Sequence, residues 1–278
     1  GHTEMICAVA FSTDGRRVCT GGPDRTIRLW DLKAHRQVAC ADVPRCLSLA
    51  FSPDGQTLVS GHLDKQFSGL MFWAVGQNAE LGSTRVIKTG PTPRFEAVPR
   101  RLQYSPDGRW IAFGGSAVNI LDVSRGTMRR FENDETAKSP IVGYQFLDDR
   151  GWLVSANYHG VLIVWNIATG TEEFRLSGNG PMTHALAARI TSIARVPGTE
   201  TILTGSEYNT ITAWNLQLRR PPQDSVSLTF PFEPGHLHLS LVVLSEDGSG
   251  LAVANDRKLY LFNVKELLAP ENAGTPKP

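Results

Sequence analysis

The sequence lacks the features of several protein classes. No apolar run approaches the roughly 18 residues of a membrane-spanning helix. The first four residues, Gly1-His2-Thr3-Glu4, have neither the basic region nor the apolar stretch of a signal peptide. Twenty-eight Lys and Arg against 27 Asp and Glu leave a formal net charge of +1, too little for a basic face that binds phosphates. We therefore expect neither nucleic acid nor a membrane as partner, and a cytoplasmic location.

Cysteine is scarce as well. The four cysteines, Cys7, Cys19, Cys40 and Cys46, all lie near the start of the chain. In a fold cross-linked by disulfides the cysteines would be distributed along the sequence, so we expect reduced thiols here.

An internal repeat, in contrast, is plainly present. Residues 10–15 (Ala-Phe-Ser-Thr-Asp-Gly) are echoed at 50–55, at 103–108 and, more weakly, at 243–248. Each copy is an apolar run that ends in turn residues, which is a hairpin signal. A second marker follows each turn, a segment of alternating polarity that ends in a large apolar residue. These end residues are Trp30, Trp73, Leu121, Trp165, Trp214 and Phe262, spaced 43 to 49 residues apart.

The two series of markers predict an all-β fold. Each repeat reads as four short antiparallel strands, in the first repeat at about 6–11, 16–21, 26–31 and 36–41. Such a unit, repeated every 40-odd residues, builds a β-propeller of four-stranded blades. We expect one propeller domain over 1–265, with a disordered tail at 266–278 and a short helical pattern at 264–268. The six repeats span about 1–41, 42–88, 89–131, 132–176, 177–218 and 219–265.

Three segments of the first repeat resemble the WD-repeat (WD40) β-propeller family, in its bacterial multi-repeat form. They are Gly1-His2, the run Thr-Gly-Gly-Pro-Asp at 20–24, and Trp30-Asp31. The resemblance covers about 1–265 and is weakest in repeats three and six. Six repeats fit a six-bladed ring, but the absence of an initial Met favours a seven-bladed ring whose N-terminal residues are missing here.

The resemblance implies a hydrogen-bonded tetrad in each blade: a loop His, a Ser or Thr on the second strand, an Asp in the next turn and a Trp on the third strand. A buried Asp needs charge-assisted partners, and a buried indole N–H needs an acceptor. Repeat one has all four members, and the others keep some of them. The expected tetrad residues are His2, Thr20, Asp24 and Trp30; Ser60, Asp64 and Trp73; Ser155 and Trp165; His184, Thr204 and Trp214; and His236 and Asp256.

Several positions depart from this pattern. Repeat two has Val43-Pro44 where Gly-His belongs, and repeat three has Leu121 in place of Trp. His159 and Tyr208 stand at the Asp positions of repeats four and five. Repeat six has Ala252 and Phe262 at the Ser/Thr and Trp positions. We expect these repeats to depend mainly on apolar packing.

Motifs that carry catalysis are missing. The sequence contains no nucleophile elbow, phosphate-binding loop or zinc-protease helix motif. Residues 178–180 (Gly-Asn-Gly) lack the third glycine of a dinucleotide loop. His236 and His238 could share a strand face that suits a metal, but we interpret His236 as the blade-loop histidine. We predict no catalytic residue, no cofactor, no metal and no enzyme activity.

The resemblance also places the loops between blades and the turns before the third strands on one docking face. Arg and Tyr, which are enriched at interface hot spots, are frequent in these segments. The segment 94–101 is the strongest candidate, because Phe95 stands among hydrogen-bond donors on a long loop. The expected partner-binding residues are Arg25, Arg45, Arg94, Phe95, Arg100, Arg101, Tyr158, His159, Tyr208 and Arg257.

These features favour a non-catalytic scaffold that binds other proteins or peptides through its loop face. Two alternatives stay open. The chain could be the C-terminal sensing or targeting module of a larger signalling enzyme, such as a kinase or a nucleotide-dependent switch protein. It could also be a periplasmic or enzymatic propeller, because residues 104–113 resemble repeats of that kind as well.

Overall fold

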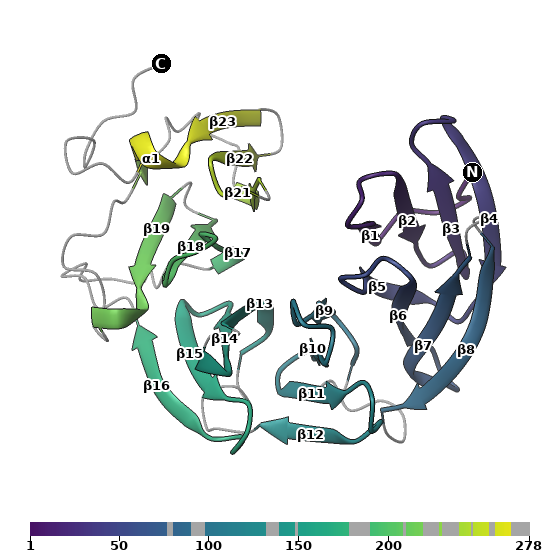
Figure 1. Ribbon diagram of the computed structural model, residues 1–278, viewed down its shortest axis with the longest axis horizontal. Helices are drawn as coiled ribbons and strands as arrows, with labels where there is room; N and C mark the ends of the chain where they lie inside the picture. The colour runs from purple at the N-terminus through teal and green to yellow at the C-terminus, as the bar shows by residue number, and fades with distance from the viewer. Residues whose placement is uncertain are drawn as a thin grey trace. The chain divides into compact units, whose positions relative to one another are not determined.

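A computed structural model describes most of the chain as short antiparallel β-strands (Figure 1). The described residues are 1–76, 80–89, 98–131, 139–147, 150–177, 190–207, 210–218, 228–229, 239–245, 247–255 and 259–267. The chain divides into two compact units, Gly1–Lys138 (unit 1) and Ser139–Pro278 (unit 2).

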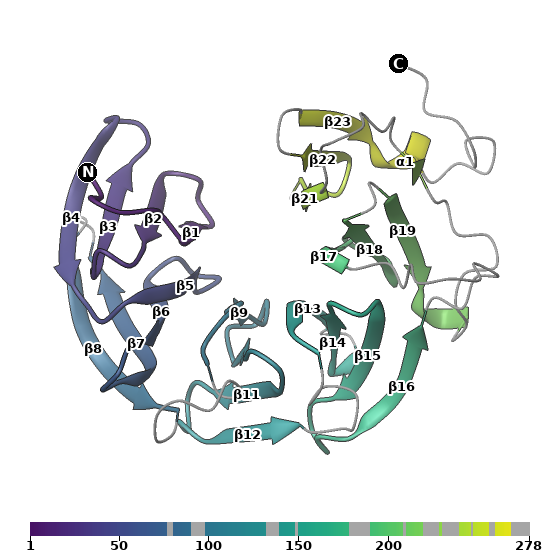
Figure 2. The same cartoon turned by 180° about the vertical axis from the view of Figure 1, so that it is seen from behind.

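Unit 1 consists of three four-stranded sheets, blades 1 to 3, in which the strands pair in chain order. The first strands β1, β5 and β9 lie along one side of the unit and the fourth strands β4, β8 and β12 along the other (Figures 1 and 2). The strands are β1 (Ala8–Phe11), β2 (Arg17–Gly21), β3 (Thr26–Asp31), β4 (Arg36–Asp42), β5 (Cys46–Phe51), β6 (Thr57–Leu63), β7 (Ser68–Val75), β8 (Leu81–Lys88), β9 (Gln103–Tyr104), β10 (Trp110–Phe113), β11 (Val118–Asp122) and β12 (Met128–Phe131).

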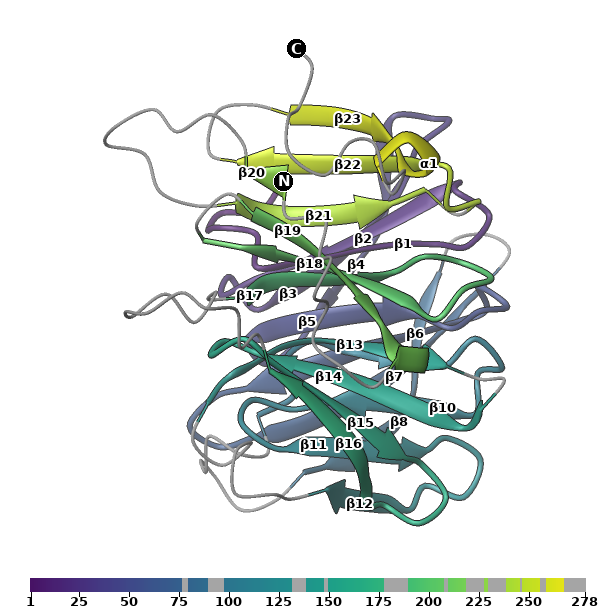
Figure 3. The ribbon, with the colours of Figure 1, turned by 90° about the vertical axis from the view of Figure 1, so that its left-hand side faces the viewer.

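Unit 2 holds blades 4 to 6, built in the same manner. Blades 4 and 5 have four strands each, and blade 6 has three within the described residues, followed by the helix α1 (Figure 3). The elements are β13 (Ile141–Leu147), β14 (Trp152–Asn157), β15 (Val161–Asn166), β16 (Glu172–Ser177), β17 (Ile190–Arg195), β18 (Thr201–Ser206), β19 (Thr210–Asn215), the 3₁₀ helix η4 (Leu216–Leu218), β20 (Leu228–Thr229), β21 (Leu239–Leu244), β22 (Gly250–Asn255), β23 (Leu259–Asn263) and α1 (Val264–Leu267).

The predicted all-β class and the propeller blades are confirmed, with three differences in detail. The fifth blade does not end near residue 218, because β20 at Leu228–Thr229 pairs with β19. The sixth blade has three described strands rather than four. The helix α1 at Val264–Leu267 confirms the helical pattern expected from residue 264, so the tail does not begin at Glu266; residues 268–278 lie outside the described part.

The middle strands of blades 2 and 5 are apolar on both faces because a neighbouring blade of the same unit covers each face. On β6, Leu58 packs into the cluster shared with blade 1, and the next residue, Val59, packs into the cluster shared with blade 3. On β18, Ile202 packs into the cluster shared with blade 4, and Leu203 packs into the cluster shared with blade 6. Successive strand residues point to opposite faces, so a strand between two neighbours cannot alternate apolar with polar residues.

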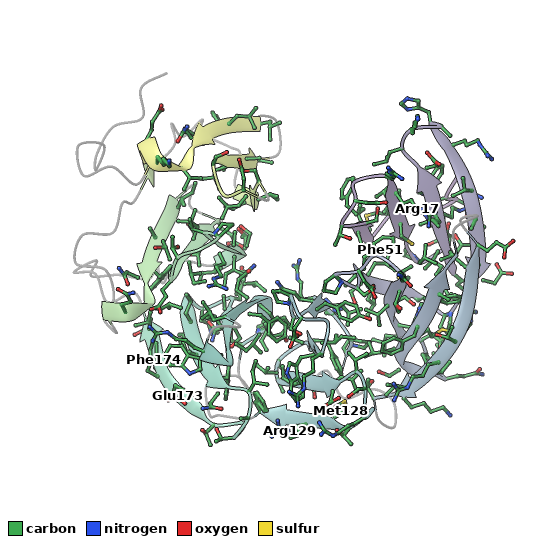
Figure 4. The ribbon with its side chains drawn as sticks, viewed as in Figure 1. Arg17, Phe51, Met128, Arg129, Glu173 and Phe174 are labelled. Carbon is green, nitrogen blue, oxygen red and sulfur yellow. The ribbon has the colours of Figure 1, made fainter. Side chains whose placement is uncertain are left out.

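In blades 1 to 4 the residues of the fourth strands, in contrast, are mostly exposed or half-buried. Figure 4 labels Met128 and Arg129 on β12 and Glu173 and Phe174 on β16, at the edge away from the first strands. Met128 is 39% exposed. Phe174 still contacts Trp152 edge-on, with 5.7 Å between the ring centroids. These edges therefore carry the mixed polar and apolar composition of a protein surface.

The repeated Ser-x-Asp-Gly segments form one kind of turn. In blades 1, 2, 3 and 6 the Ser hydroxyl donates to the Asp carboxylate at 2.5–2.6 Å. The same carboxylate accepts the backbone N–H two residues further on at 3.0 Å. The Gly that follows has a φ of 65–71°, a left-handed conformation that side chains disfavour. Ser, Asp and Gly thus each have a defined place in the hairpin.

Replacing Gly108 by alanine should lower the free energy of unfolding by about 1 kcal/mol, because the left-handed backbone would then carry a side chain. Steric contact adds little, since a Cβ would lie 3.6 Å from Cδ of Pro53. Urea denaturation measures the change. Gly82→Ala is the matched control: Gly82 lies in a strand without a positive φ, with nothing within 4 Å of an added Cβ. Equal losses for the two variants would contradict the backbone explanation.

Candidate functional site

The four tetrad residues of blade 1 lie together. His2 Nδ1 is 2.7 Å from Asp24 Oδ2, and His2 Nε2 is 2.7 Å from Thr20 Oγ1. The indole N–H of Trp30 donates to Thr20 Oγ1 at 2.8 Å. Thr20 Oγ1 thus lies between the indole of Trp30 and the imidazole of His2, and the imidazole in turn contacts the carboxylate of Asp24. The loop before β1 is thereby fastened to β2 and β3.

Asp24 is the charged member of this tetrad. Its side chain is only 2% exposed. Burial by itself opposes ionisation, but the hydrogen bonds from His2, Thr26 and Thr3 outweigh it and lower the pKa of Asp24 to about 2. The carboxylate is therefore ionised at neutral pH, and its hydrogen bonds come from His2, Thr26 and Thr3.

Blade 2 contains a different set, which the sequence analysis missed. Trp73 donates its indole N–H to Ser60 Oγ at 2.7 Å, as Trp30 does to Thr20. His62, on the same strand as Ser60, takes the place of the loop histidine, with Nε2 2.6 Å from Ser60 Oγ. Its Nδ1 donates to the carbonyl of Pro44 at 2.8 Å, which fixes the tautomer. The signal was present: residues two apart on a strand share a face, and Ser60 and His62 are so placed.

Asp64 does not join Ser60 and Trp73, so its assignment to the tetrad is corrected. Its Oδ1 accepts the backbone N–H groups of Gln66 and Phe67, each at 2.8 Å. Its Oδ2 is 3.3 Å from the guanidinium of Arg25, whose side chain is 68% exposed. In blade 2 the carbonyl of Pro44 is the hydrogen-bond partner of the histidine, the role that Asp24 has in blade 1. Asp64 instead caps a turn.

Stability should depend on the ionisation of His62. Burial lowers the pKa of His62 to about 4, below the ordinary value of 6.5. Between these two values the unfolded chain binds a proton that the folded chain does not. The free energy of unfolding should therefore fall as the pH drops from 6.5 towards 4, by at most about 1.4 kcal/mol per pH unit. Urea titrations across this range measure the slope.

His62→Gln is the control for this pH dependence. Glutamine retains polar atoms at the site but does not titrate. The variant should be less stable at pH 7, and its stability should change less between pH 6.5 and 4. An unchanged slope would show that His62 is not the group responsible.

Blades 4 and 5 keep the tryptophan–hydroxyl pair. Trp165 donates to Ser155 Oγ and Trp214 to Thr204 Oγ1, both at 2.8 Å. The expected members His184, His236 and Asp256 lie outside the described residues. In blade 6, Phe262 pairs with Leu251, as Trp30 pairs with Val18 in blade 1. Val253 rather than Ala252 therefore stands at the Ser/Thr position, a correction of one residue.

The expected partner-binding residues that the structure describes fall into three groups. Arg25 has a φ of 62° and pairs with Asp64. In unit 2, Tyr158 donates to Glu207 Oε1 at 2.7 Å, and its ring lies 6.1 Å from that of His159. Arg45, Arg100 and Arg101 line one cavity. Arg94, Phe95, Tyr208 and Arg257 lie outside the described residues.

This cavity, of about 500 Å³, lies within unit 1 beside the first strands. Its walls come from residues 7–9, from Arg45 and 47–49, and from residues 100–102. Arg45 precedes β5, and Arg100 and Arg101 precede β9, so arginines from two loops that are far apart in sequence meet at one place. The remaining lining is mostly apolar, with Ala8, Val9 and leucines.

The segment that carries Arg100 and Arg101 is held against blade 2. Ser48 donates its hydroxyl to the carbonyl of Pro99 at 2.5 Å. A Cβ on Gly61 would collide with that carbonyl, so glycine permits the close approach. The N–H of Arg100 bonds to the carbonyl of Val98, and its own carbonyl accepts from Gly114. The backbone beneath the two arginines is therefore fixed by several contacts.

The four cysteines divide into two exposed and two buried thiols, none of them in a disulfide. Burial raises the pKa of the Cys46 thiol to about 12 and raises that of Cys19 as well. Cys7 and Cys40 should therefore react with a maleimide in the folded protein, and Cys19 and Cys46 only after unfolding. Mass spectrometry of intact protein counts the labels. Rapid labelling of Cys19 or Cys46 without denaturant would contradict the packing around them.

Within the described ranges, no three His, Cys, Asp or Glu residues are grouped as a metal site would require. None of the helices in that same part of the chain has the length and apolar character needed to cross a membrane.

Comparison with known proteins gives consistent similarities. The sequence profile of the family described as "WD domain, G-beta repeat" matches residues 1–31 and 32–67. WD repeat-containing protein 82 of Drosophila melanogaster is 24% identical over 193 residues, covering 65% of this chain and 56% of that protein. Autophagy-related protein 16 of Arabidopsis thaliana is 38% identical over 204 residues, covering 59% of this chain and 40% of that protein.

A shorter similarity exists to small ribosomal subunit protein RACK1 of Drosophila melanogaster, 36% identical over 90 residues, or 28% of this chain and 27% of that protein. The chain thus spans about half of the first of these relatives and less of the other two. All three are animal or plant proteins, so the bacterial form of the family stays a prediction.

Proposed function

We propose that this chain, which belongs to the WD-repeat β-propeller family, is a non-catalytic scaffold that binds other proteins through the loops beside its first strands. The observation that carries the proposal is the meeting of Arg45, Arg100 and Arg101 at one cavity in unit 1. These residues were expected to bind a partner from their positions in loops. Arginine beside apolar surface is a frequent composition at the centre of protein interfaces.

We further propose that the protein works in the cytoplasm and binds neither nucleic acid nor membranes. The free thiols of Cys7 and Cys40 suit a reducing compartment. The net charge of +1 supplies little non-specific attraction to phosphate-bearing surfaces.

Two exposed cysteines allow a direct test of the docking surface. Cys7 lines the cavity, whereas Cys40 lies on the fourth strand of blade 1. The chain with Cys40→Ser is modified at Cys7 with a bulky maleimide, and the chain with Cys7→Ser is modified at Cys40 as the matched control. Both serve as bait in an extract of the organism that carries the gene, and captured proteins are purified and titrated against each bait.

We expect a protein that binds saturably to the unmodified chain and to the Cys40-modified chain, and at least tenfold more weakly to the Cys7-modified chain. Two results would overturn the proposal. One is that no captured protein binds saturably after purification. The other is that modification at Cys40 weakens binding as much as modification at Cys7 does.

A further inference from the structure

We propose that the cavity of unit 1 binds an acidic peptide segment, in which carboxylates pair with Arg45 and Arg100 and apolar side chains contact the leucines that line the cavity. The inference rests on the proposed scaffold function and names the chemistry of the partner. It follows from the charge, the lining and the fixed backbone of the cavity.

The charge of the cavity is of one sign. Among the described residues that line it, three are arginines and none is acidic. Arg45 and Arg100 are exposed and form no ion pair with any described residue, unlike Arg25, which pairs with Asp64. Guanidinium groups bind carboxylates through two parallel hydrogen bonds, which adds direction to the attraction. An anionic ligand would therefore find its counter-charges already in place.

The size and lining of the cavity favour a peptide over a single anion. A volume of about 500 Å³ lies in the range of ligand pockets and is many times the roughly 30 Å³ that one water occupies. Leu47, Leu49 and Leu102 line it together with the arginines. Because the charges come from two loops, the lining suits carboxylates that are separated along a chain, with apolar side chains between them.

The backbone that presents Arg100 and Arg101 is organised before binding. The Ser48 hydroxyl and the Gly114 N–H bond to the carbonyls of Pro99 and Arg100. Arg101 has a φ of 56°, a conformation that costs a non-glycine residue free energy and is retained where the surroundings enforce it. Binding would thus order long side chains but no backbone, which limits its entropic cost.

The test uses the full chain and a fluorescein-labelled peptide of sequence Glu-Asp-Leu-Glu-Asp-Leu, with Gln-Asn-Leu-Gln-Asn-Leu as the uncharged probe. Fluorescence anisotropy measures binding to the wild type, to Arg45→Gln/Arg100→Gln, and to Lys33→Gln/Lys88→Gln. The last variant loses the same two charges at exposed positions outside the cavity. The rate of maleimide labelling of Cys7, compared with Cys40, locates the bound peptide.

We expect the acidic peptide to bind saturably, and about tenfold more weakly per arginine removed, while the lysine variant binds like the wild type. Raising the salt concentration should weaken binding, and bound peptide should slow the labelling of Cys7 but not of Cys40. Equal binding of the uncharged peptide, no binding of the acidic one, or equal losses in the two double variants would overturn the inference.

This experiment separates the inference from the scaffold function. If the scaffold function is right and the inference is wrong, a captured protein still binds the Arg45→Gln/Arg100→Gln chain as tightly as the wild type. If the scaffold function is wrong, no captured protein binds saturably, whatever the peptides do.

Discussion

Replacing Trp165 by alanine should lower the free energy of unfolding by about 4 kcal/mol. Trp165 is 1% exposed and is the largest fully buried side chain among the described residues. The substitution removes the apolar area of the indole from the core and leaves a cavity between strands that cannot fully collapse. It also deprives Ser155 of the N–H group that donates to its hydroxyl at 2.8 Å. Urea denaturation of the full chain measures the loss.

Two variants separate the causes of this loss. Trp165→Phe keeps most of the apolar volume and removes the N–H group, so it should cost about 1–2 kcal/mol. Trp110→Ala removes the same atoms from a half-buried position, where the ring lies under the guanidinium of Arg109, and should cost clearly less than Trp165→Ala. Equal losses at Trp165 and Trp110 would contradict the assignment of the loss to buried packing.

Much of the fold could be predicted because its signals are local. The turn at Ser12, Asp14 and Gly15 is closed by bonds among neighbouring residues, so its sequence specifies it in every copy. The distance between hairpins then sets the strand length, and a fixed long period requires repeated blades. In blade 1, the strands expected at about 26–31 and 36–41 are observed at Thr26–Asp31 and Arg36–Asp42.

What could not be predicted depends on distant residues. Leu121 replaces a tryptophan and is still fully buried, because blade 2 and blade 3 residues surround it whatever its type. His62 replaces the loop histidine because the Pro44 carbonyl lies within 2.8 Å, a contact between segments 18 residues apart. The tetrad pattern assigned the Asp position by spacing alone, and Asp64 instead follows the local rule for capping a turn.

The candidate site, like the fold, could be predicted from the sequence only in part. Loop positions were sufficient to mark Arg45, Arg100 and Arg101 individually, but nothing in the spacing says that they share a cavity. The link is the approach of Pro99 to Gly61 and Ser48, which brings the chain before β9 against blade 2. The absence of a side chain at Gly61 thus bears on the proposed site, because it allows the approach that positions two arginines of another blade.

Replacing Ser60 by alanine should lower the free energy of unfolding by about 3 kcal/mol. Ser60 and His62 are fully buried and Trp73 is 4% exposed, so water cannot replace the lost hydroxyl. The variant leaves the indole N–H of Trp73 without its acceptor and Nε2 of His62 without its donor, and each unsatisfied group costs about 1–3 kcal/mol. Ser155→Ala is the matched control: its hydroxyl accepts from Trp165 and should cost about half as much.

A double-mutant cycle tests whether the Ser60 hydroxyl acts through the tryptophan. Trp73→Phe removes the N–H group that needs the acceptor, so Ser60→Ala should cost at least about 1 kcal/mol less in that background than in the wild type. The remaining cost is then due to His62, whose Nδ1 stays bonded to the Pro44 carbonyl. If the two substitutions add without coupling, the hydroxyl does not act through the indole of Trp73, and the Trp73–Ser60 bond does not stabilise blade 2.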